Sequence, residues 1–339
     1  MASAAGRYFG RTPDGQDVHL YEVSDRHGLS MAVCSYGAAI VSLEVPDASG
    51  RKLDVVLGFD NVEDYVRSID LPAPPHFGAA IGRWAGRINK GIFNLNGTRY
   101  HLRPNNNGHS LHGGRYGFSQ RVWKLADYDA GRYITFHLDS PDGDEDFPGR
   151  VEAKVRYELD ALSLIVRFEA FAHEDTIVNM TQHSYFNLDG HTGNVLTQKL
   201  SVRSDALLET REMIPTGKVS AAEDTHYDHR ALRPVPDRID ATFVLNREAG
   251  PAARLQSDSS GLALEVFTNQ PAVHIYVGGD CFGLIPGKNG ASYHRHSGIC
   301  FETQNFPDAP NHAHFPSPVL RKGQTYAHET IYQFHNKLS

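Results

Sequence analysis

The feature that most constrains the fold is a strict alternation of apolar and charged residues in the middle of the chain. Over 151–159 every second residue is apolar, and each residue between them is Glu, Lys or Arg. A period of two residues places one face of a β-strand in a core and the other in solvent. The alternation resumes over 164–170 after a turn at Asp160 and Ala161, so these segments are predicted to form a β-hairpin.

Strand-like segments recur along the rest of the chain, whereas helical periodicity is weak. A second hairpin is predicted where Asn96-Gly97 separates 91–95 from 98–102, because both turn residues tolerate a positive φ. Only 61–66 is expected to form a short helical turn. Further strands are expected at 18–23, 29–45, 54–58, 133–138, 263–268 and 272–277. The chain is therefore predicted to be all-β, a large antiparallel β-sandwich of two packed sheets.

The composition gives no reason to divide the chain. Its 31 Gly and 18 Pro residues are spread evenly and no repeat is found, so residues 1–339 are predicted to form a single domain. The formal net charge of -7 argues against nucleic acid and anionic membranes as partners, because both require a basic face.

Cysteine usage and apolar runs bear on the compartment. The three cysteines, Cys34, Cys281 and Cys300, show no CxxC spacing and are expected to be free thiols. No stretch approaches 18 consecutive apolar residues, and no secretory signal is recognised at the N-terminus. We therefore expect a cytosolic protein.

Four segments interrupt the alternating pattern with dense polar and aromatic residues, and loops on a β scaffold commonly carry function. The segment 179–188 contains His183, which could transfer a proton near neutral pH or could be a hydrogen-bonded core histidine. The segment 300–311 contains Glu302, whose apolar neighbours would raise its pKa and suit it to acid/base work. The alternative for Glu302 is a surface glutamate at a strand end.

Two further segments could bind a polar ligand such as a sugar. The segment 82–88 holds Arg83, Trp84 and Arg87, which could donate to hydroxyls and stack on a sugar ring, or could lie solvated on the surface. The segment 105–114 holds a histidine followed by two glycines, which would allow a ligand to approach closely. The alternative is a turn with an incidental histidine.

The 19 histidines raise the question of a metal site. His-x-His pairs at His294/His296 and His312/His314 would place two rings on one side of a strand, but no zinc-binding framework accompanies them. The chain also lacks a GxSxG elbow, a P-loop and a GxGxxG after a strand. We therefore expect neither a metal nor a cofactor.

Taken together, these segments resemble the aldose 1-epimerase (galactose mutarotase) family. The matching motifs follow the family's order and cover nearly the whole chain: GRWAGRI at 82–88, GHSLHGG at 108–114, SPDGDEDFPG at 140–149, NMTQHSYFNLDG at 179–190, IPTG at 214–217, TNQPAVHIYVGG at 268–279 and ETQNFPDAPN at 302–311. The resemblance implies a galactose mutarotase-like β-sandwich with its site in an open cleft on one sheet. It also implies interconversion of the α and β anomers of free hexoses such as glucose and galactose.

The resemblance implies a role for each matching residue. Glu302 corresponds to the general base that takes the proton of the O1 hydroxyl, and His183 to the general acid that protonates the ring oxygen O5. The remaining matches hold the sugar or support the ring-oxygen side: His112, Arg87, Asp240 and Gln270. Opening a hemiacetal needs one group to remove a proton and another to deliver one, and we expect the pair on opposite sides of the anomeric centre.

Departures from the family pattern concern sugar preference rather than the acid/base pair. Gly86 stands where the family usually has asparagine, and His274 occupies a position where glutamine is common.

A hexose 6-phosphate is an alternative substrate, with Arg83, Arg87 and Arg115 as candidate phosphate ligands. A second alternative is a non-catalytic carbohydrate-binding or regulatory protein on the same fold. The expected partner is a free monosaccharide, and the expected assembly is a monomer or weak homodimer.

Overall fold

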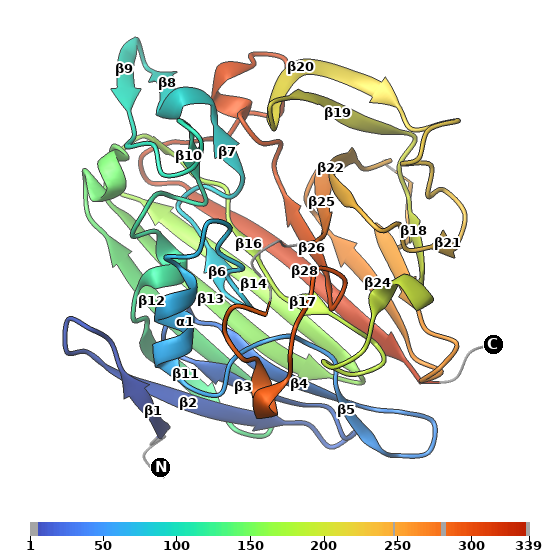
Figure 1. Cartoon of the computed structure of the whole chain (residues 1–339). Helices are drawn as coiled ribbons and strands as arrows, with labels where there is room; N and C mark the ends of the chain where they lie inside the picture. Colours follow the sequence, from blue (N-terminus) through green and yellow to red (C-terminus); the bar gives the residue numbers. More distant parts are fainter. Residues whose placement is uncertain (1–5, 247, 279–282, 337–339) are drawn as a thin grey trace.

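Almost all regular structure in the computed structural model is β (Figure 1). It describes residues 6–246, 248–278 and 283–336. Within these ranges the large sheets have nine, six and five strands, and every ladder is antiparallel. The predicted all-β class and antiparallel β-sandwich are confirmed. None of the helices in these ranges has the length and apolar composition needed to cross a membrane.

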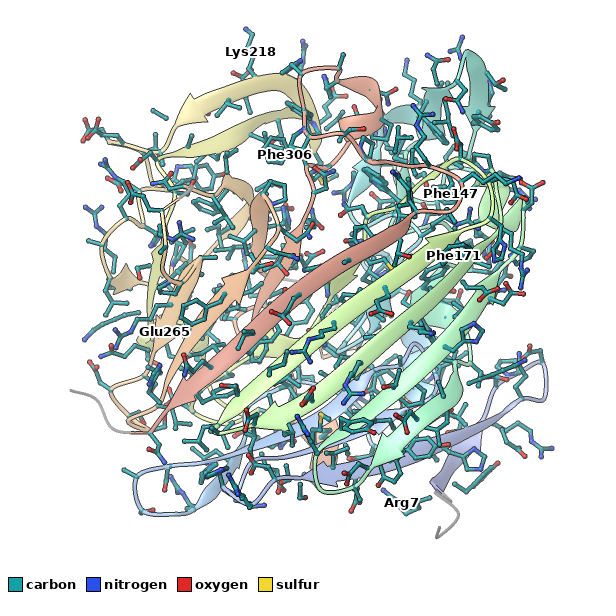
Figure 2. All side chains as sticks on the ribbon, turned by 180° about the vertical axis from the view of Figure 1, so that it is seen from behind. Arg7, Phe147, Phe171, Lys218, Glu265 and Phe306 are labelled. Carbon is teal, nitrogen blue, oxygen red and sulfur yellow. The ribbon has the colours of Figure 1, made fainter. Side chains whose placement is uncertain are left out.

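The nine-stranded sheet contains the hairpin predicted from the alternating segment, and Figure 2 shows its long strands from behind. In spatial order the strands are β11 (Lys124–Asp129), β12 (Tyr133–Ser140), β13 (Val151–Asp160), β14 (Ser163–Ala172), β28 (Thr325–His335), β24 (Ala263–Thr268), β23 (Ala253–Gln256), β18 (Lys199–Val202) and β21 (Arg233–Pro234). Asp160 pairs with Ser163, so the turn is at Ala161 and Leu162, one residue later than predicted. Both turn residues have positive φ, which matches the twist of a two-residue hairpin.

The six-stranded sheet lies beside it and carries the candidate site. In spatial order its strands are β17 (Tyr185–Phe186), β26 (Ile299–Gln304), β25 (Ala272–Val277), β22 (Ile239–Val244), β19 (Ala206–Arg211) and β20 (Ile214–Ala221). Val155 and Phe168 of the nine-stranded sheet share one buried cluster with Ile275 and Phe301 of this sheet. Burial of these side chains between the two sheets is the main source of stability in such a sandwich.

The five-stranded sheet completes the set of larger sheets near the N-terminus. Its strands in order are β1 (Arg7–Arg11), β2 (Asp17–Ser24), β3 (Ser30–Cys34), β4 (Ile40–Pro46) and β5 (Lys52–Asp54). The single strand expected over 29–45 is two strands, because Gly37 and Ala38 adopt positive φ and turn the chain between them. The strand expected over 54–58 does not form as one strand. Asp54 is the last residue of β5, and Val56 makes only an isolated bridge to Phe186.

The remaining strands are short. Four two-stranded sheets pair β6 (Ala80–Ile81) with β16 (Thr181–Gln182), β7 (Arg87–Ile88) with β10 (Ser110–Leu111), β8 (Ile92–Leu95) with β9 (Thr98–His101), and β15 (Thr176–Ile177) with β27 (Val319–Leu320). The hairpin predicted at Asn96-Gly97 is confirmed by the β8–β9 pairing. Short 3₁₀ helices span Asn89–Gly91, Phe118–Gln120, Asp144–Asp146, Val195–Thr197, Lys288–Gly290 and Ala309–Asn311.

The predicted helical turn is α1 (Val62–Ser68), the single α-helix of the described residues. The side chain of Asn61 caps it by accepting a hydrogen bond from the Asp64 N–H at 2.9 Å. Elsewhere, Cys34 and Cys300 are buried free thiols, as expected. Cys281 and the last glycine of the 268–279 motif lie outside the described residues.

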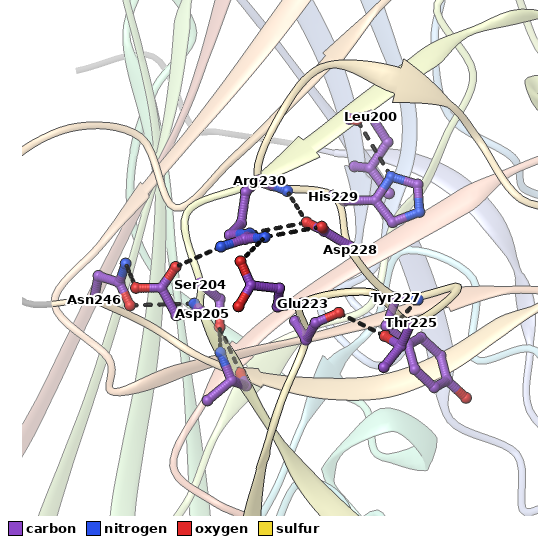
Figure 3. Close-up of polar contacts among 12 residues, drawn as sticks. Leu200, Ser204, Asp205, Glu223, Thr225, Tyr227, Asp228, His229, Arg230 and Asn246 are labelled. Carbon is purple, nitrogen blue, oxygen red and sulfur yellow. Dashed lines mark hydrogen bonds and ion pairs between the residues drawn. The ribbon is translucent and has the colours of Figure 1, made fainter.

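A cluster of charges fixes the connection that leads to β22 (Figure 3). The Arg230 guanidinium pairs with Asp228 at 3.0 Å, Glu223 at 3.1 Å and Asp205 at 4.0 Å. Asp205 in turn accepts a hydrogen bond from the side chain of Asn246 at 3.0 Å. Hydrogen bonding to Arg230 lowers the pKa of Asp228 to about 2. The cluster joins the start of β19 to the segment just after β22.

Candidate active site

One face of the six-stranded sheet forms the floor of an open cleft of about 420 Å³. Glu302 on β26 lies directly opposite His274 on β25, and Asp240 on β22 lies opposite Tyr276 on β25. These four side chains line the cleft. Side chains alternate across a strand, so the intervening residue Phe301 points the other way into the core. The strand pattern thus separates a polar, ligand-facing surface from an apolar one.

His183 approaches this floor from the loop between β16 and β17. Its backbone N–H donates to the carbonyl of Ala79 at 3.0 Å, and its carbonyl accepts from the Gly78 N–H at 3.1 Å. Its ring is buried, and Nε2 lies 3.5 Å from Oε1 of Glu302. Two residues from distant motifs therefore meet in one cleft.

Burial shifts the two pKa values in opposite directions. Glu302 is 3% exposed, and desolvation raises its pKa to about 7, although the charges of His274 and Arg87 act against the rise. Desolvation, together with the neighbouring His76, lowers the pKa of His183 well below its usual value. Below about pH 7 the pair therefore holds a proton, and that proton resides on Glu302 rather than on His183.

The expected placement of the pair on opposite sides of the anomeric centre stays a prediction. At 3.5 Å, Glu302 and His183 stand side by side, and a sugar ring cannot pass between them. Adjacent groups nevertheless suit the chemistry, because O1 and O5 of a cyclic sugar are bonded to the same carbon. One group can reach O1 while its neighbour reaches O5.

His112 follows β10 with a positive φ, and its ring packs at right angles to that of His183. The Gly86 N–H donates to Nδ1 of His112 at 3.3 Å, so the proton of the neutral ring lies on Nε2. This tight turn requires Gly113, because a Cβ there would lie 2.0 Å from the Gly82 carbonyl oxygen. His112 therefore offers an N–H donor in the cleft.

Charged side chains surround the pair. Nε and Nη2 of Arg87 donate to the side-chain oxygen Oδ1 of Asn106 at 3.2 and 3.1 Å, which fixes the guanidinium in the cleft wall. Nε2 of His274 lies 3.2 Å from Asp240, and its Nδ1 lies 2.9 Å from Thr242 Oγ1. Burial alone would lower the pKa of His274, but the hydrogen bond to Asp240 and the charges of Glu302 and Asp240 outweigh it, and the pKa is raised.

Gln270, predicted to hold the sugar, lies elsewhere. It is in the turn between β24 and β25, its side chain donates to Asn269 at 2.9 Å, and it does not line the cleft. β25 begins at Ala272, and the residue of this motif that reaches the cleft beside Glu302 is His274.

Arg83 and Arg115, which were predicted together with Arg87 as candidate phosphate ligands, also lie away from the cleft. Arg83 is 2% exposed and donates to the carbonyls of Ser140, Pro148 and Gly149, so it anchors the 140–149 loop. Arg115 lines a neighbouring cavity instead. Trp84 is buried in a separate apolar cluster and is not available to stack on a sugar.

The side chains around Glu302 and His183 include residue types that can bind a metal ion. His112, His183 and Glu302 can bring their ligand atoms within 4.8 Å of one another, and such residues bind zinc in other proteins. In the neutral ring of His112, however, one nitrogen accepts from Gly86 and the other carries the proton. His112 is thus arranged as a hydrogen-bond donor, and the absence of a metal stays a prediction.

Comparisons with known proteins agree with this arrangement. The family model for aldose 1-epimerase matches residues 19–333. The chain belongs to the aldose 1-epimerase family. A galactose mutarotase from Pongo abelii is 41% identical over 98% of this chain and 99% of the relative. An aldose 1-epimerase from Escherichia coli K12 is 31% identical over 95% of this chain and 96% of the relative.

Solved structures place this aldose 1-epimerase family member in the same fold. A GalM/aldose epimerase homologue from C. elegans has a TM-score of 0.88 and 28% identity, covering 95% of this chain and all of the other. A galactose 1-epimerase from Lactobacillus acidophilus has a TM-score of 0.85 at 24% identity, covering 98% and 99%, and shows the shared fold.

Both departures of this family member from the usual pattern line the cleft, at Gly86 and His274. Three cleft or near-cleft residues escaped the sequence reading: Tyr276, Gln304 and His76. For Tyr276 a signal existed, because the alternation over 272–277 puts it on the same strand face as His274. His76 is half-buried with its ring against those of His112 and His183, and no periodic pattern marks it.

Proposed function

We propose that this chain is an aldose 1-epimerase that interconverts the α and β anomers of free hexoses such as glucose and galactose. The observation that carries the proposal is the 3.5 Å approach of Glu302 and His183 in a cleft on the six-stranded sheet. Membership of the aldose 1-epimerase family, and galactose mutarotase as the name of close relatives, support the same reaction.

In the proposed mechanism, ring opening and closing are coupled proton transfers. The pair's single proton first passes from Glu302 to His183 across the 3.5 Å between them. The ionised Glu302 then takes the proton of the O1 hydroxyl, the C1–O5 bond breaks, and the protonated His183 delivers its proton to O5. The product is the open-chain aldehyde. Rotation about C1–C2 presents the other face of the carbonyl, and the two proton transfers run in reverse. The enzyme is regenerated without a net change of proton or electron count, and each positioned group contributes about 100- to 10,000-fold.

The other lining groups are proposed to orient the sugar. The N–H of His112 donates on the ring-oxygen side, because its other nitrogen is occupied by Gly86. Arg87 donates to hydroxyls from the wall of the cleft, and the Asp240–His274 pair accepts and donates from the floor. Positioning of this kind raises the rate by holding the reacting atoms against the acid/base pair.

The alternative substrate, a hexose 6-phosphate, needs cations in the cleft. Of its three candidate arginines only Arg87 lines the cleft, which favours the free sugar. Arg238 and Arg295 also line the cleft, however, so a direct comparison of substrates is the informative test.

The test is polarimetry of freshly dissolved α-D-glucose, α-D-galactose and α-D-glucose 6-phosphate with and without the protein. We expect faster relaxation for the free hexoses, and an unchanged rate after dialysis against a chelator. Acceleration of the 6-phosphate alone would favour the phosphorylated substrate. Sugar binding without any acceleration would favour the non-catalytic alternative.

We also propose that the protein acts in the cytosol on free monosaccharides, without nucleic acid or membrane, as a monomer or weak homodimer. The net charge of -7 and the buried free thiols of Cys34 and Cys300 support this setting. Light scattering over a range of concentrations measures the assembly, and cell fractionation the compartment.

A further inference from the structure

One buried amide oxygen in the cleft has no hydrogen-bond partner within the part of the chain that the structure describes. Gln304 is the last residue of β26, lies two residues after Glu302, and lines the cleft. The residue is 1% exposed, and its Oε1 is buried with no partner among the described residues. Buried polar groups in native proteins are almost always hydrogen-bonded, so an unpaired amide at a ligand site indicates a partner supplied by the ligand.

The neighbours of Gln304 show that this is not a general feature of the strand end. Thr303 Oγ1 lies 2.6 Å from Thr330 Oγ1, and the side chain of Asn305 both donates to Pro316 and accepts from Phe306. Seven buried side-chain atoms without a partner occur among the described residues, and only Gln304 Oε1 belongs to a residue that lines the cleft.

Glycine at position 86 leaves space beside the amide. A Cβ at Gly86 would lie 3.4 Å from Nε2 of Gln304 and 3.2 Å from the ring of Pro307. A side chain at this position would therefore lie directly against the amide. The departure from the family pattern at Gly86 and the unpaired amide thus occur at the same place in the cleft.

Strand spacing indicates which part of the sugar is within reach. Residues two apart on one strand face are separated by about 7 Å. The ring hydroxyls of a hexose that lie furthest from C1 are those on C3 and C4, so with C1 held at Glu302 these two are the candidates to reach Gln304. We propose, on the basis of the function proposed above, that Gln304 is a specificity-determining residue whose Oε1 accepts a hydrogen bond from the sugar hydroxyl on C3 or C4.

The test replaces Gln304 with leucine, which has a similar size and no polar atoms. For Gln304→Leu we expect kcat/KM on glucose and galactose to fall roughly 3- to 10-fold, the range of one neutral hydrogen bond. One of the two sugars 3-deoxyglucose and 4-deoxyglucose, the one that lacks the bonded hydroxyl, should give equal kcat/KM for wild type and variant. The other, and 2-deoxyglucose, should show the same fall as glucose. The thermal midpoint of the free protein should not decrease, because no intramolecular bond is lost.

A matched control is Gln198→Leu. Gln198 is also fully buried, but its amide bonds Asn187 and Leu188, so this variant should lose thermal stability without selectivity among the deoxy sugars. The proposal is overturned if Gln304→Leu keeps full activity, or if it loses activity equally on every deoxy sugar.

Wild-type activity in the same assay keeps the two proposals separate. If the wild type is inactive, the proposed reaction fails, and the proposal for Gln304 is decided by galactose binding measured by calorimetry. Weaker binding by Gln304→Leu would then support the hydrogen bond, and unchanged binding would overturn it.

Discussion

Glu302 is buried among Arg87, His274 and Asp240, and desolvation raises its pKa from 4.5 to about 7. A carboxyl group whose pKa is raised on folding destabilises the folded state as pH rises from the unfolded pKa to the folded one. The shift corresponds to about 3 kcal/mol at 1.36 kcal/mol per pKa unit. Below pH 4.5 the group is protonated in both states and this cost is absent.

Glu302→Gln is therefore expected to stabilise the protein at pH 8, by up to about 3 kcal/mol, because glutamine cannot ionise. The gain over wild type should shrink as pH falls through 7 and vanish near pH 4.5. Chemical denaturation at pH 5, 6.5 and 8 measures it. A gain that is the same at all three pH values would show that burial of the charge is not its origin.

The pH dependence of catalysis follows from the single proton that Glu302 and His183 share. Since the pKa of Glu302 is about 7 and that of His183 is well below its usual value, kcat/KM should fall as pH rises through about 7, where the pair loses its last proton. The charge of His274 lowers the pKa of Glu302, so His274→Gln should move this fall to higher pH. A rate that rises to a plateau above pH 7 would contradict the shared proton.

The meeting of Glu302 and His183 could be predicted from the sequence because each residue lies within a distinctive motif. The binding residues were harder to predict, since their role depends on which strand face they occupy. Gln270 and His274 belong to one motif, yet only His274 lies within β25 and faces Glu302. Gln304 is singled out by the lack of a hydrogen-bond partner for its Oε1 among the described residues, and a sequence alone cannot show such an unpaired atom.

At the scale of elements, alternating strands with local turns were predictable, and strands that depend on backbone strain were not. The β13–β14 hairpin follows from its period of two and differs from the prediction by one residue in its turn. The segment 29–45 is divided into two strands by a turn in which Ala38 has a positive φ. Alanine rarely adopts this conformation, so the sequence does not predict the turn.

The 82–88 segment contains one arginine for stability and one for the site. Arg83→Met should lower the free energy of unfolding by about 3 to 5 kcal/mol, because the 140–149 loop would lose its buried donors. Arg87→Met should leave the midpoint of unfolding nearly unchanged and lower kcat/KM by about 10- to 100-fold. Unfolding curves and polarimetry on both variants check the contrast, and the reverse pattern would contradict these assignments.

At the scale of the molecule, the order of strands was beyond the sequence reading. β28, from the end of the chain, lies between β14 and β24, and β26 lies between β17 and β25. These pairings join segments far apart in the chain, and a periodic pattern contains no information about which distant strands pair. The β-sandwich class could be predicted because alternation requires a covered face on every strand, although the structure has three large sheets rather than the two expected.

We propose that residues 1–339 unfold as one domain, because a single buried cluster includes residues from all three large sheets. Phe301→Ala, behind the cleft floor, should destabilise the whole protein by about 3 to 5 kcal/mol. Fluorescence and circular dichroism should show one coincident transition that shifts as a unit. Two separated transitions would contradict the single domain.

The central claim is that Glu302 and His183 act together on one sugar. Its most direct test is kcat/KM for Glu302→Gln, His183→Asn and the double variant, measured by polarimetry on galactose. Groups that act as a unit are strongly non-additive, so each single variant should lose at least about 100-fold and the double variant little more. Wild-type rates in either single variant, or losses that multiply in the double variant, would contradict the shared proton transfer.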